Sequence, residues 1–404
     1  DPSKPTVTVN VTYKVGSRHE NYGETGMAHL LEHLIFKGSE RHPSPEKEFS
    51  RRGFRNNGTT WFDRTNYFST FQATDENLRW ALDWKADAMV NSFIAKEDLD
   101  SEMTVVRNEY EMGENEPFRV LYKRLFATAF QWHNYGNSTI GNRSDIENVR
   151  IENLQAFYRL YYQPDNAVLT VAGKFDVEAT LPLIAQTFGK IPRPKRELPP
   201  LWTVEPTQDG ERSFVVRRKG DVQIVMVGYR IPSLLSDSTA AISAAADILG
   251  DTPNGRLHRE LVATGMAAQV FSWAMQVRDP GLAVFGALVK KGEPVERVRD
   301  KLIEIVETSF AQQPPTEAEM TRMRQDNATG FDRALANPQQ FGVSLSEYIA
   351  AGDWRLFFLT REHTARVTAD EVAREATRFF RRDNRTVGLF LPEDEPQRAE
   401  IPAP

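Results

Sequence analysis

Apolar and polar residues alternate at several points along the chain, and this alternation predicts β-strands. Near the N-terminus, Val7, Val9 and Val11 are separated by single polar residues. A period of two places the valines on one face of a strand and the polar residues on the other. By this pattern, or by short apolar runs, the sequence predicts strands at residues 6–15, 167–172, 214–217, 222–229, 282–289 and 386–391.

Other segments repeat apolar residues at helical spacing, and they predict helices at residues 76–92, 153–162, 238–249 and 295–309. In the last of these, Val295, Val298, Leu302 and Ile305 form one stripe. We interpret the stripe as a surface that covers a sheet, in preference to a partner site. Strands and helices are mixed in both halves of the chain. The expected fold class is therefore α+β, with helices against a mixed sheet in each half.

A proline-rich stretch at residues 191–210 divides the chain near its midpoint and predicts an extended connector. The two halves also resemble each other. Ser92-Phe93 followed by Glu102-Met103 recurs as Ser309-Phe310 followed by Glu319-Met320, at the same spacing. We therefore predict a duplicated domain. The expected division is 1–190, a linker at 191–212, and a homologous second domain at 213–404.

Composition narrows the class of protein. The 404 residues include 26% charged and 40% hydrophobic residues, as in ordinary globular domains. A net charge of −6 argues against a nucleic-acid partner, and no apolar run approaches the length of a membrane-spanning helix. The absence of Cys excludes disulfides, thiolate ligands and a thiol nucleophile. The chain begins at Asp1 without a Met, so we expect that a segment, such as a signal peptide, was removed upstream.

The segment His29-Leu30-Leu31-Glu32-His33 carries the strongest chemical signal. In a helix over residues 27–37, capped by Thr25, His29 and His33 share one face. Two imidazoles one turn apart can bind a divalent metal, and Glu32 would place a base beside it. The spelling H-x-x-E-H is the inverzincin pattern. The alternative interpretation is a buried helix whose histidines are satisfied by hydrogen bonds alone.

A catalytic zinc needs a third protein ligand. The segment 99–112 repeats Leu99, Met103, Val106 and Tyr110 at near-helical spacing. Glu102 and Glu109 are seven residues apart on this predicted helix, so they share a face. From the spacing alone, either carboxylate could reach the metal. In the second half of the chain, Asp326 replaces Glu109 and the paired histidines have no counterpart, so only the first copy is expected to bind zinc.

Three stretches together resemble the pitrilysin (insulinase-like) metallopeptidases, and in particular the two-domain subfamily that includes mitochondrial processing peptidase. The first runs from Val15 to Glu20 and continues through the histidine pair to Phe36-Lys37-Gly38. The second is Asn57-Gly58-Thr59-Thr60 with Thr65 and Tyr67, similar to the family's N-A-x-T…T-x-Y block. The third is Glu102 with Val105-Val106-x-x-Glu109, similar to its E-x6-E helix.

The resemblance implies one Zn²⁺ per chain, held by His29, His33 and Glu109. Glu32 would be the general base, and Glu102 would be an outer carboxylate that orients a histidine ligand. The stretch Asn57, Gly58, Thr59 and Thr60 would be an exposed edge strand that pairs with an extended peptide substrate. The family also implies two homologous domains, each a mixed, mostly antiparallel sheet covered by helices, arranged as a clam shell.

One departure from the family pattern concerns the second domain. There the family usually supplies an Arg and a Tyr that bind substrate and stabilise the oxyanion. In this chain Val262 and Ala268 occupy the corresponding positions, and neither can donate a side-chain hydrogen bond. We therefore expect a heterodimer, in which a homologous partner carries the Arg/Tyr pair and completes the site.

Two alternatives remain open. The chain could be a self-sufficient homodimeric or monomeric peptidase in which Tyr229, Arg256 or another arginine replaces the missing pair. It could also be a non-catalytic core-type scaffold subunit, although such relatives usually lose the metal residues. From the resemblance to exported paired peptidases we expect a bacterial periplasmic location, with the cytoplasm as the alternative. The physiological substrate does not follow from the residues.

Overall fold

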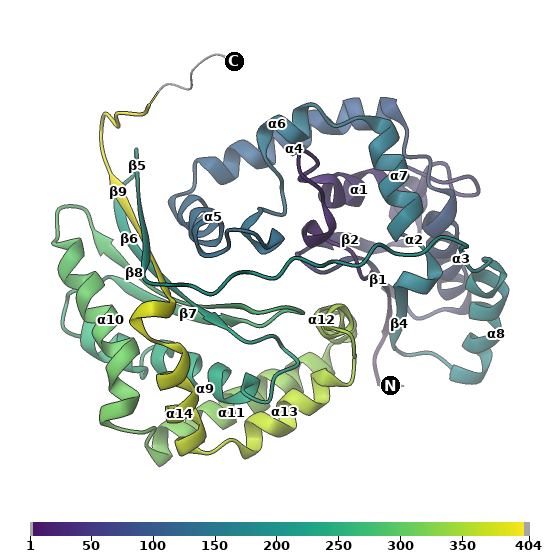
Figure 1. Ribbon diagram of the computed structural model, residues 1–404. Helices are drawn as coiled ribbons and strands as arrows, with labels where there is room; N and C mark the ends of the chain where they lie inside the picture. Colours follow the sequence, from purple (N-terminus) through teal and green to yellow (C-terminus); the bar gives the residue numbers. More distant parts are fainter. Residues whose placement is uncertain (1–2, 400–404) are drawn as a thin grey trace. The chain divides into compact units, whose positions relative to one another are not determined.

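Two β-sheets organise the chain in the computed structural model, which describes residues 3–399 (Figure 1). The first sheet has the strand order β2-β3-β1-β4, and the second has the order β5-β9-β6-β8-β7. All neighbouring strands are antiparallel except β5 and β9. The strands are β1 (Thr6–Tyr13), β2 (Arg55–Thr60), β3 (Thr65–Gln72), β4 (Ala167–Gly173), β5 (Arg212–Arg218), β6 (Val222–Ile231), β7 (Gln269–Met275), β8 (Gly281–Lys290) and β9 (Arg385–Pro392).

The helices cover these sheets, and the α+β prediction is confirmed. They are α1 (Met27–Ile35), α2 (Pro45–Arg52), α3 (Asp75–Asn91), α4 (Lys96–Glu114), α5 (Pro117–Ala129), α6 (Arg143–Glu147), α7 (Ile151–Tyr161), α8 (Val177–Thr187), α9 (Thr239–Gly250), α10 (Val295–Gln312), α11 (Glu317–Ala336), α12 (Pro338–Ala351), α13 (Leu356–Arg366) and α14 (Ala369–Phe379). The predicted helices correspond to α3, α7, α9 and α10 within a few residues.

The strand pairing of the first sheet recurs in the second. The order β2-β3-β1-β4 matches β7-β8-β6-β9, and each corresponding pair is antiparallel. Strand β5, which lies parallel to β9, is added at one edge of the second sheet. This correspondence supports the duplication that the sequence indicates, and it makes β7 the counterpart of the edge strand β2.

In the first unit the sheet is covered on both faces. The valines of β1 lie in a core with residues of α1, α3 and α7. The intervening polar residues of β1 face α12, which packs on β1, β3 and β4. Asn10, on this second face, is fully buried and donates hydrogen bonds to Gly342 O and Ser346 Oγ, both at 2.9 Å. The face beneath α12 is therefore polar and internally hydrogen-bonded.

In the second unit an apolar core lies on one side of the sheet. Val225, Val227 and Tyr229 of β6 pack there with residues of α9, α10 and α14. Helix α5 packs against β5, β6 and β9, and Leu125 of this helix approaches Gly228. Because Gly228 has no side chain, the helix can come close to the strand.

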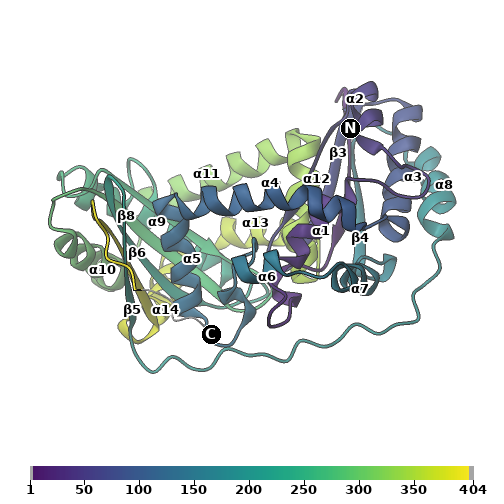
Figure 2. The ribbon, with the colours of Figure 1, turned by 90° about the horizontal axis from the view of Figure 1, so that it is seen from above.

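The two compact units differ from the predicted sequential division in two segments. The segment Met112–Gly136, which contains α5, belongs with the second sheet, and the segment Thr329–Phe357, which contains α12, belongs with the first. Each half of the chain thus contributes one helix to the unit built mainly by the other half. Residues 191–211 contain no helix or strand and run as an extended connector (Figure 2).

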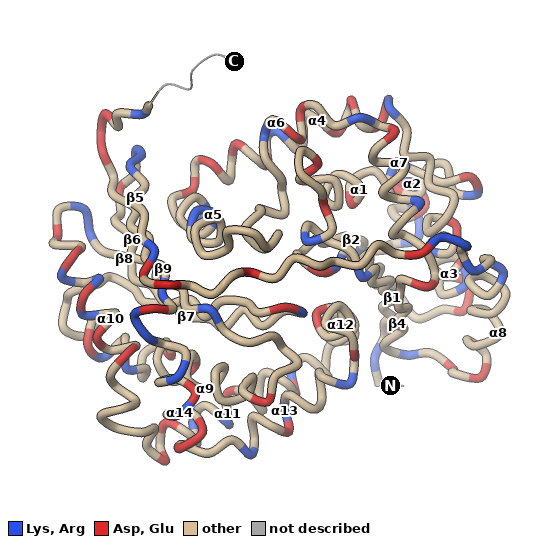
Figure 3. The backbone as a smooth tube through the Cα atoms, in the orientation of Figure 1, with Lys and Arg blue, Asp and Glu red and all other residues tan. Residues whose placement is uncertain are grey.

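Lys and Arg are interspersed with Asp and Glu along both units (Figure 3). Helix α4 departs from this balance, because it carries seven Asp or Glu residues and two Lys or Arg residues. Two of these acids, Glu102 and Glu109, approach the histidines of α1. Among residues 3–399, no helix has the length and apolar character needed to cross a membrane.

Candidate metal centre

Helix α1 presents its two histidines from a firmly anchored position. Leu30, Leu31 and Leu34 are almost fully buried, whereas His29 and His33 are half-buried on another face of the helix. The apolar face therefore fixes the rotation of the helix about its axis, and with it the direction of both imidazoles.

The N-terminus of α1 is capped differently from the prediction. Thr25 is the cap that the sequence predicts, but its hydroxyl donates to Asp145 at 2.7 Å. Gly26 is the residue before the helix, with a φ of 94°, and Glu20 supplies the acceptors. The two carboxylate oxygens of Glu20 accept from the backbone N–H groups of Gly26 at 2.8 Å and Ala28 at 2.9 Å. Burial raises the pKa of Glu20 to about 8.

The structure brings His29, His33 and Glu109 together. Oε2 of Glu109 lies 3.5 Å from Nε2 of His29 and 3.6 Å from Nε2 of His33. One ligand atom from each residue falls within 4.8 Å of the others. A tetrahedral ion with bonds of roughly 2.0–2.1 Å holds its ligand atoms about 3.4 Å apart. The two distances from Glu109 to the histidines and the N, N, O donor set therefore fit a zinc ion.

Glu102 lies behind His33. Its Oε2 is 3.0 Å from Nδ1 of His33, and its other oxygen forms an ion pair with Lys37. With Nδ1 engaged by a carboxylate, Nε2 of His33 is left to face Glu109. By contrast, Nδ1 of His29 is buried and has no hydrogen-bond partner within the described residues. The sequence spacing does not show which of Glu102 and Glu109 is the third metal ligand. In the structure Glu109 lies near Nε2 of both histidines, whereas Glu102 lies against Nδ1 of His33.

The charges at this centre follow from burial and from the neighbouring carboxylates. Burial and the adjacent His33 lower the pKa of His29 to about 4, so its ring is neutral at neutral pH. Burial alone would lower the pKa of His33, but Glu109 and Glu102 raise it above its ordinary value. The pKa of Glu109 lies below its ordinary value, chiefly because of His33. A neutral imidazole and an ionised carboxylate are the forms that bind metal ions.

Glu32 lies beside the edge strand β2. Its Oε2 accepts a hydrogen bond from the hydroxyl of Thr60 at 2.6 Å. Gly58 makes this approach possible, because a Cβ atom at that position would lie 2.7 Å from Cγ of Glu32. Burial raises the pKa of Glu32 above its ordinary value, although the Thr60 hydrogen bond opposes the shift. Sequence reasoning identified Glu32 but not its hydrogen bond with Thr60.

The predicted substrate strand is an edge strand. β2 is hydrogen-bonded only to β3 within the described sheet, in a register that pairs Gly58 with Tyr67 and Thr59 with Asn66. Beside it lies a cavity of about 500 Å³. Its lining includes His33, Phe36, Phe49, Phe54, Asn57 and Glu102. A free strand edge and a cavity lined mainly by polar residues, with three phenylalanines, therefore lie next to the paired histidines.

The side chains considered as replacements for the missing Arg/Tyr pair are engaged elsewhere. All five N–H groups of Arg256 have acceptors, in Glu319 and in the carbonyls of Ser309, Gln313 and Pro314. Tyr229 is fully buried, and its hydroxyl lies 3.0 Å from Glu307. Val262 belongs to a π-helical turn (His258–Val262), and Ala268 immediately precedes β7. Neither Arg256 nor Tyr229 thus has a free donor for an oxyanion.

Comparison with known proteins adds independent information. The family model described as "Insulinase (Peptidase family M16)" matches residues 1–143, and the model described as "Peptidase M16 inactive domain" matches residues 148–327. The candidate metal residues all lie within the first match. The chain is 29% identical over 391 residues to the zinc protease PqqE of Helicobacter pylori, covering 95% of this chain and 87% of that protein.

Two further relatives show the range of the similarity. A probable β subunit of mitochondrial-processing peptidase from Arabidopsis thaliana is 31% identical over 191 residues, which is 47% of this chain and 36% of that one. Among solved structures, a protease from Helicobacter pylori superposes with a TM-score of 0.91 at 28% identity, covering 96% of this chain and 95% of that one. The expected family resemblance is confirmed.

Proposed function

Since the chain belongs to the M16 family of insulinase-like (pitrilysin-like) peptidases, we propose that it is a zinc metalloendopeptidase that hydrolyses extended peptides. The observation that carries this proposal is the convergence of His29, His33 and Glu109 beside the carboxylate of Glu32. Homologues named zinc proteases support membership of a peptidase family that uses zinc.

Three side chains would hold one Zn²⁺: His29 and His33 through Nε2, and Glu109 through Oε2. When bound, the ion would supply Lewis-acid polarisation of the scissile carbonyl and would lower the pKa of a water molecule to about 7. Glu102 would keep the imidazole of His33 in the required tautomer and orientation.

Glu32 would act as the general base and then as the general acid. Oε2 of Glu32 is held by Thr60, so Oε1 is the oxygen available to accept a proton from the attacking water. The same proton can then pass to the leaving amine. The raised pKa of Glu32 favours this exchange, because it brings the carboxyl nearer to neutral pH.

The edge strand β2 would align the substrate. Asn57 to Thr60 would pair with an extended peptide through main-chain hydrogen bonds, so sequence preference would be loose. The neighbouring cavity, lined in part by Phe36, Phe49 and Phe54, would accept a substrate side chain. This arrangement favours unfolded segments and peptides over folded proteins.

A homologous partner would complete the site as a heterodimer. Arg256 donates its hydrogen bonds to Glu319, and Tyr229 donates to Glu307, so neither side chain offers a free donor for the oxyanion. This favours the heterodimer over the self-sufficient homodimer. The scaffold alternative is disfavoured by the presence of all three metal-binding side chains. We propose that the protein is located in the bacterial periplasm, with the cytoplasm as the alternative. Cell fractionation against a cytoplasmic marker enzyme tests it.

The decisive experiment compares wild type with Glu32→Gln. We expect the variant to retain about one zinc per chain by elemental analysis and to lose peptide cleavage. Turnover by Glu32→Gln at the wild-type rate would contradict the assigned base. Assaying the purified chain alone and after addition of a homologous Arg/Tyr-bearing subunit tests the assembly, because full activity of the chain alone would exclude an obligate partner.

A further inference from the structure

We propose that Arg64, held by Glu347 of α12, is a positioning residue that fixes the substrate strand β2 relative to the general base. This inference rests on the proposed peptidase function. Arg64 lies between β2 and β3, and its side chain is largely buried. Glu347 lies far away in the sequence, on the helix that the C-terminal half of the chain contributes to the first unit.

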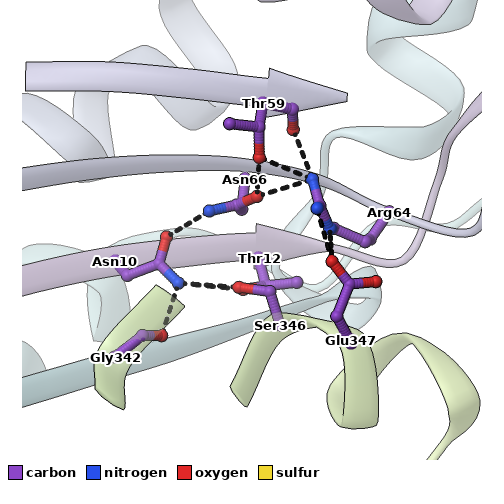
Figure 4. A network of polar contacts seen from close by, with 8 residues as sticks. All are labelled: Asn10, Thr12, Thr59, Arg64, Asn66, Gly342, Ser346 and Glu347. Atoms are coloured by element: carbon purple, nitrogen blue, oxygen red, sulfur yellow. Dashed lines mark hydrogen bonds and ion pairs between the residues drawn. The ribbon is translucent and has the colours of Figure 1, made fainter. Parts of the chain in front are cut away.

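The guanidinium of Arg64 donates hydrogen bonds to the end of β2 (Figure 4). Nη1 donates to the backbone oxygen of Thr59 at 2.9 Å, to the Thr59 hydroxyl oxygen at 2.6 Å, and to Oδ1 of Asn66 at 3.0 Å. The Thr59 hydroxyl also donates to Oδ1 of Asn66 at 2.6 Å. One cation therefore ties the backbone and the side chain of Thr59 to the neighbouring strand β3.

Glu347 holds the other side of the same guanidinium. Its Oε1 accepts from Nε of Arg64 at 2.9 Å and from Nη2 at 2.5 Å. A planar guanidinium bound through two of its nitrogens has a fixed orientation, which a lysine ammonium would not have. Glu347 thus determines where Nη1 points.

Helix α12 is itself fixed to the centre of the sheet. Ser346, next to Glu347, accepts a hydrogen bond from Asn10 at 2.9 Å and contacts the hydroxyl of Thr12 at 2.8 Å. Asn66 donates in turn to Oδ1 of Asn10 at 3.1 Å. The contacts form one network that runs from β1 through α12 to Arg64 and the end of β2 (Figure 4). It is buried at Asn10, Asn66 and Ser346 and half-exposed at Glu347.

Two consecutive residues of β2 are consequently held from different sides. Thr60 donates to the candidate base Glu32, and Thr59 is bound by Arg64. Since side chains alternate along a strand, these contacts lie on opposite faces of the sheet. The strand end cannot shift without breaking one of them. A peptide paired with β2 would take its register from this position, so Arg64 would set which bond lies beside Glu32.

The test compares Arg64→Met, Arg64→Lys and Glu347→Gln with wild type on a defined unstructured casein peptide. We expect KM to rise about tenfold in Arg64→Met while kcat falls less than about threefold, as loss of uniform substrate binding requires. Mass spectrometry of the products should show additional cleavage positions. Arg64→Lys should restore part of the wild-type KM, and zinc content should remain unchanged. Arg159→Met, at an exposed arginine of α7 in the same unit, is the matched control.

A second readout is independent of activity. Hydrogen exchange of the β2 amides should be faster in Arg64→Met and in Glu347→Gln, and the double variant should add little to either single change. Unchanged exchange with unchanged KM and product positions would overturn the proposal. If the wild-type assembly does not cleave the peptide, the proposed function fails, and the exchange data still decide whether Arg64 and Glu347 position β2.

Discussion

The carboxylate of Glu102 bridges His33 and Lys37, with Oε2 3.0 Å from Nδ1 of the histidine. Burial alone would raise the pKa of Glu102, but Lys37 and His33 lower it below its ordinary value. An ionised carboxylate at this position favours a proton on Nδ1, so Nε2, which faces Glu109, is the nitrogen of His33 that can bind a metal ion once it is deprotonated. Lys37 thus acts on the candidate metal centre through Glu102.

This relationship predicts the effect of Glu102→Gln. The amide removes the negative charge that orients His33 but keeps a similar shape. We expect zinc affinity to fall about 10- to 100-fold, as is typical when the partner of a ligand histidine is lost. Competition with a fluorescent chelator measures this change. The control is Glu97→Gln, at an exposed acid on the same helix, which should bind zinc as wild type does. Equal affinities in all three proteins would show that Glu102 does not orient a ligand.

The hydrogen bond from Thr60 to Glu32 predicts a second outcome. Thr60→Val keeps the side-chain shape but removes the donor at 2.6 Å. Because hydrogen bonds to charged groups contribute about 1.5–3 kcal/mol, kcat should fall about 10- to 100-fold. Zinc content should stay at the wild-type level, since Thr60 is not a candidate ligand.

Thr60→Ser tests the chemical basis of that effect, because it restores a hydroxyl without the methyl group. We expect it to recover most of the wild-type kcat. If Thr60→Val retains the wild-type kcat, the hydroxyl is not needed to position the base.

Most residues of the candidate metal centre could be predicted from the local sequence. His29 and His33 share a helix face because four residues make about one turn, and Glu102 and Glu109 share a face for a similar reason. These are short-range relationships that periodicity reveals directly. Which of the two glutamates approaches both imidazoles depends on how α4 packs against α1, and only the family resemblance or the structure can distinguish them.

Other features depended on long-range packing that no periodicity encodes. Thr25 has the residue type of a helix cap, but its hydroxyl donates a hydrogen bond to Asp145. The carboxylate of Glu20, which precedes the helix in the sequence, accepts from the backbone N–H of Gly26 instead. Likewise, Asn10 alternates with the valines of β1 in a pattern typical of a solvent-facing strand surface. It is buried because α12 covers that face and satisfies its polar groups. An amphipathic stripe indicates that a helix must pack, but not against which sheet.

The environment of Arg256 predicts a structural role. Its guanidinium is buried with Glu319, so Arg256→Met should lower the free energy of unfolding by roughly 3–5 kcal/mol, the usual cost of breaking a buried ion pair. Arg259 also contacts Glu319, at 3.1 Å, but its side chain is 54% exposed. Arg259→Met should therefore cost less than about 1 kcal/mol. Urea unfolding followed by circular dichroism measures both values. Equal stability of the two variants would contradict the assignment.

The same ion pair predicts a pH dependence of stability. Burial alone would raise the pKa of Glu319, but hydrogen bonds from Arg256 and from the backbone N–H of Thr316 lower it from 4.5 to about 2. A carboxyl whose pKa is depressed in the folded state stabilises the fold above its unfolded pKa. That contribution is lost as pH falls from about 4.5 toward 2.

Glu319→Gln isolates this contribution, because an amide cannot titrate. The difference in unfolding free energy between wild type and Glu319→Gln should be largest above about pH 5 and should shrink steadily as the pH approaches 2. Other carboxylates titrate equally in both proteins, so they cancel in the difference. A difference that stays constant across this range would mean that the pKa of Glu319 is the same in the folded and unfolded states, and it would contradict the predicted contribution of its ion pair with Arg256.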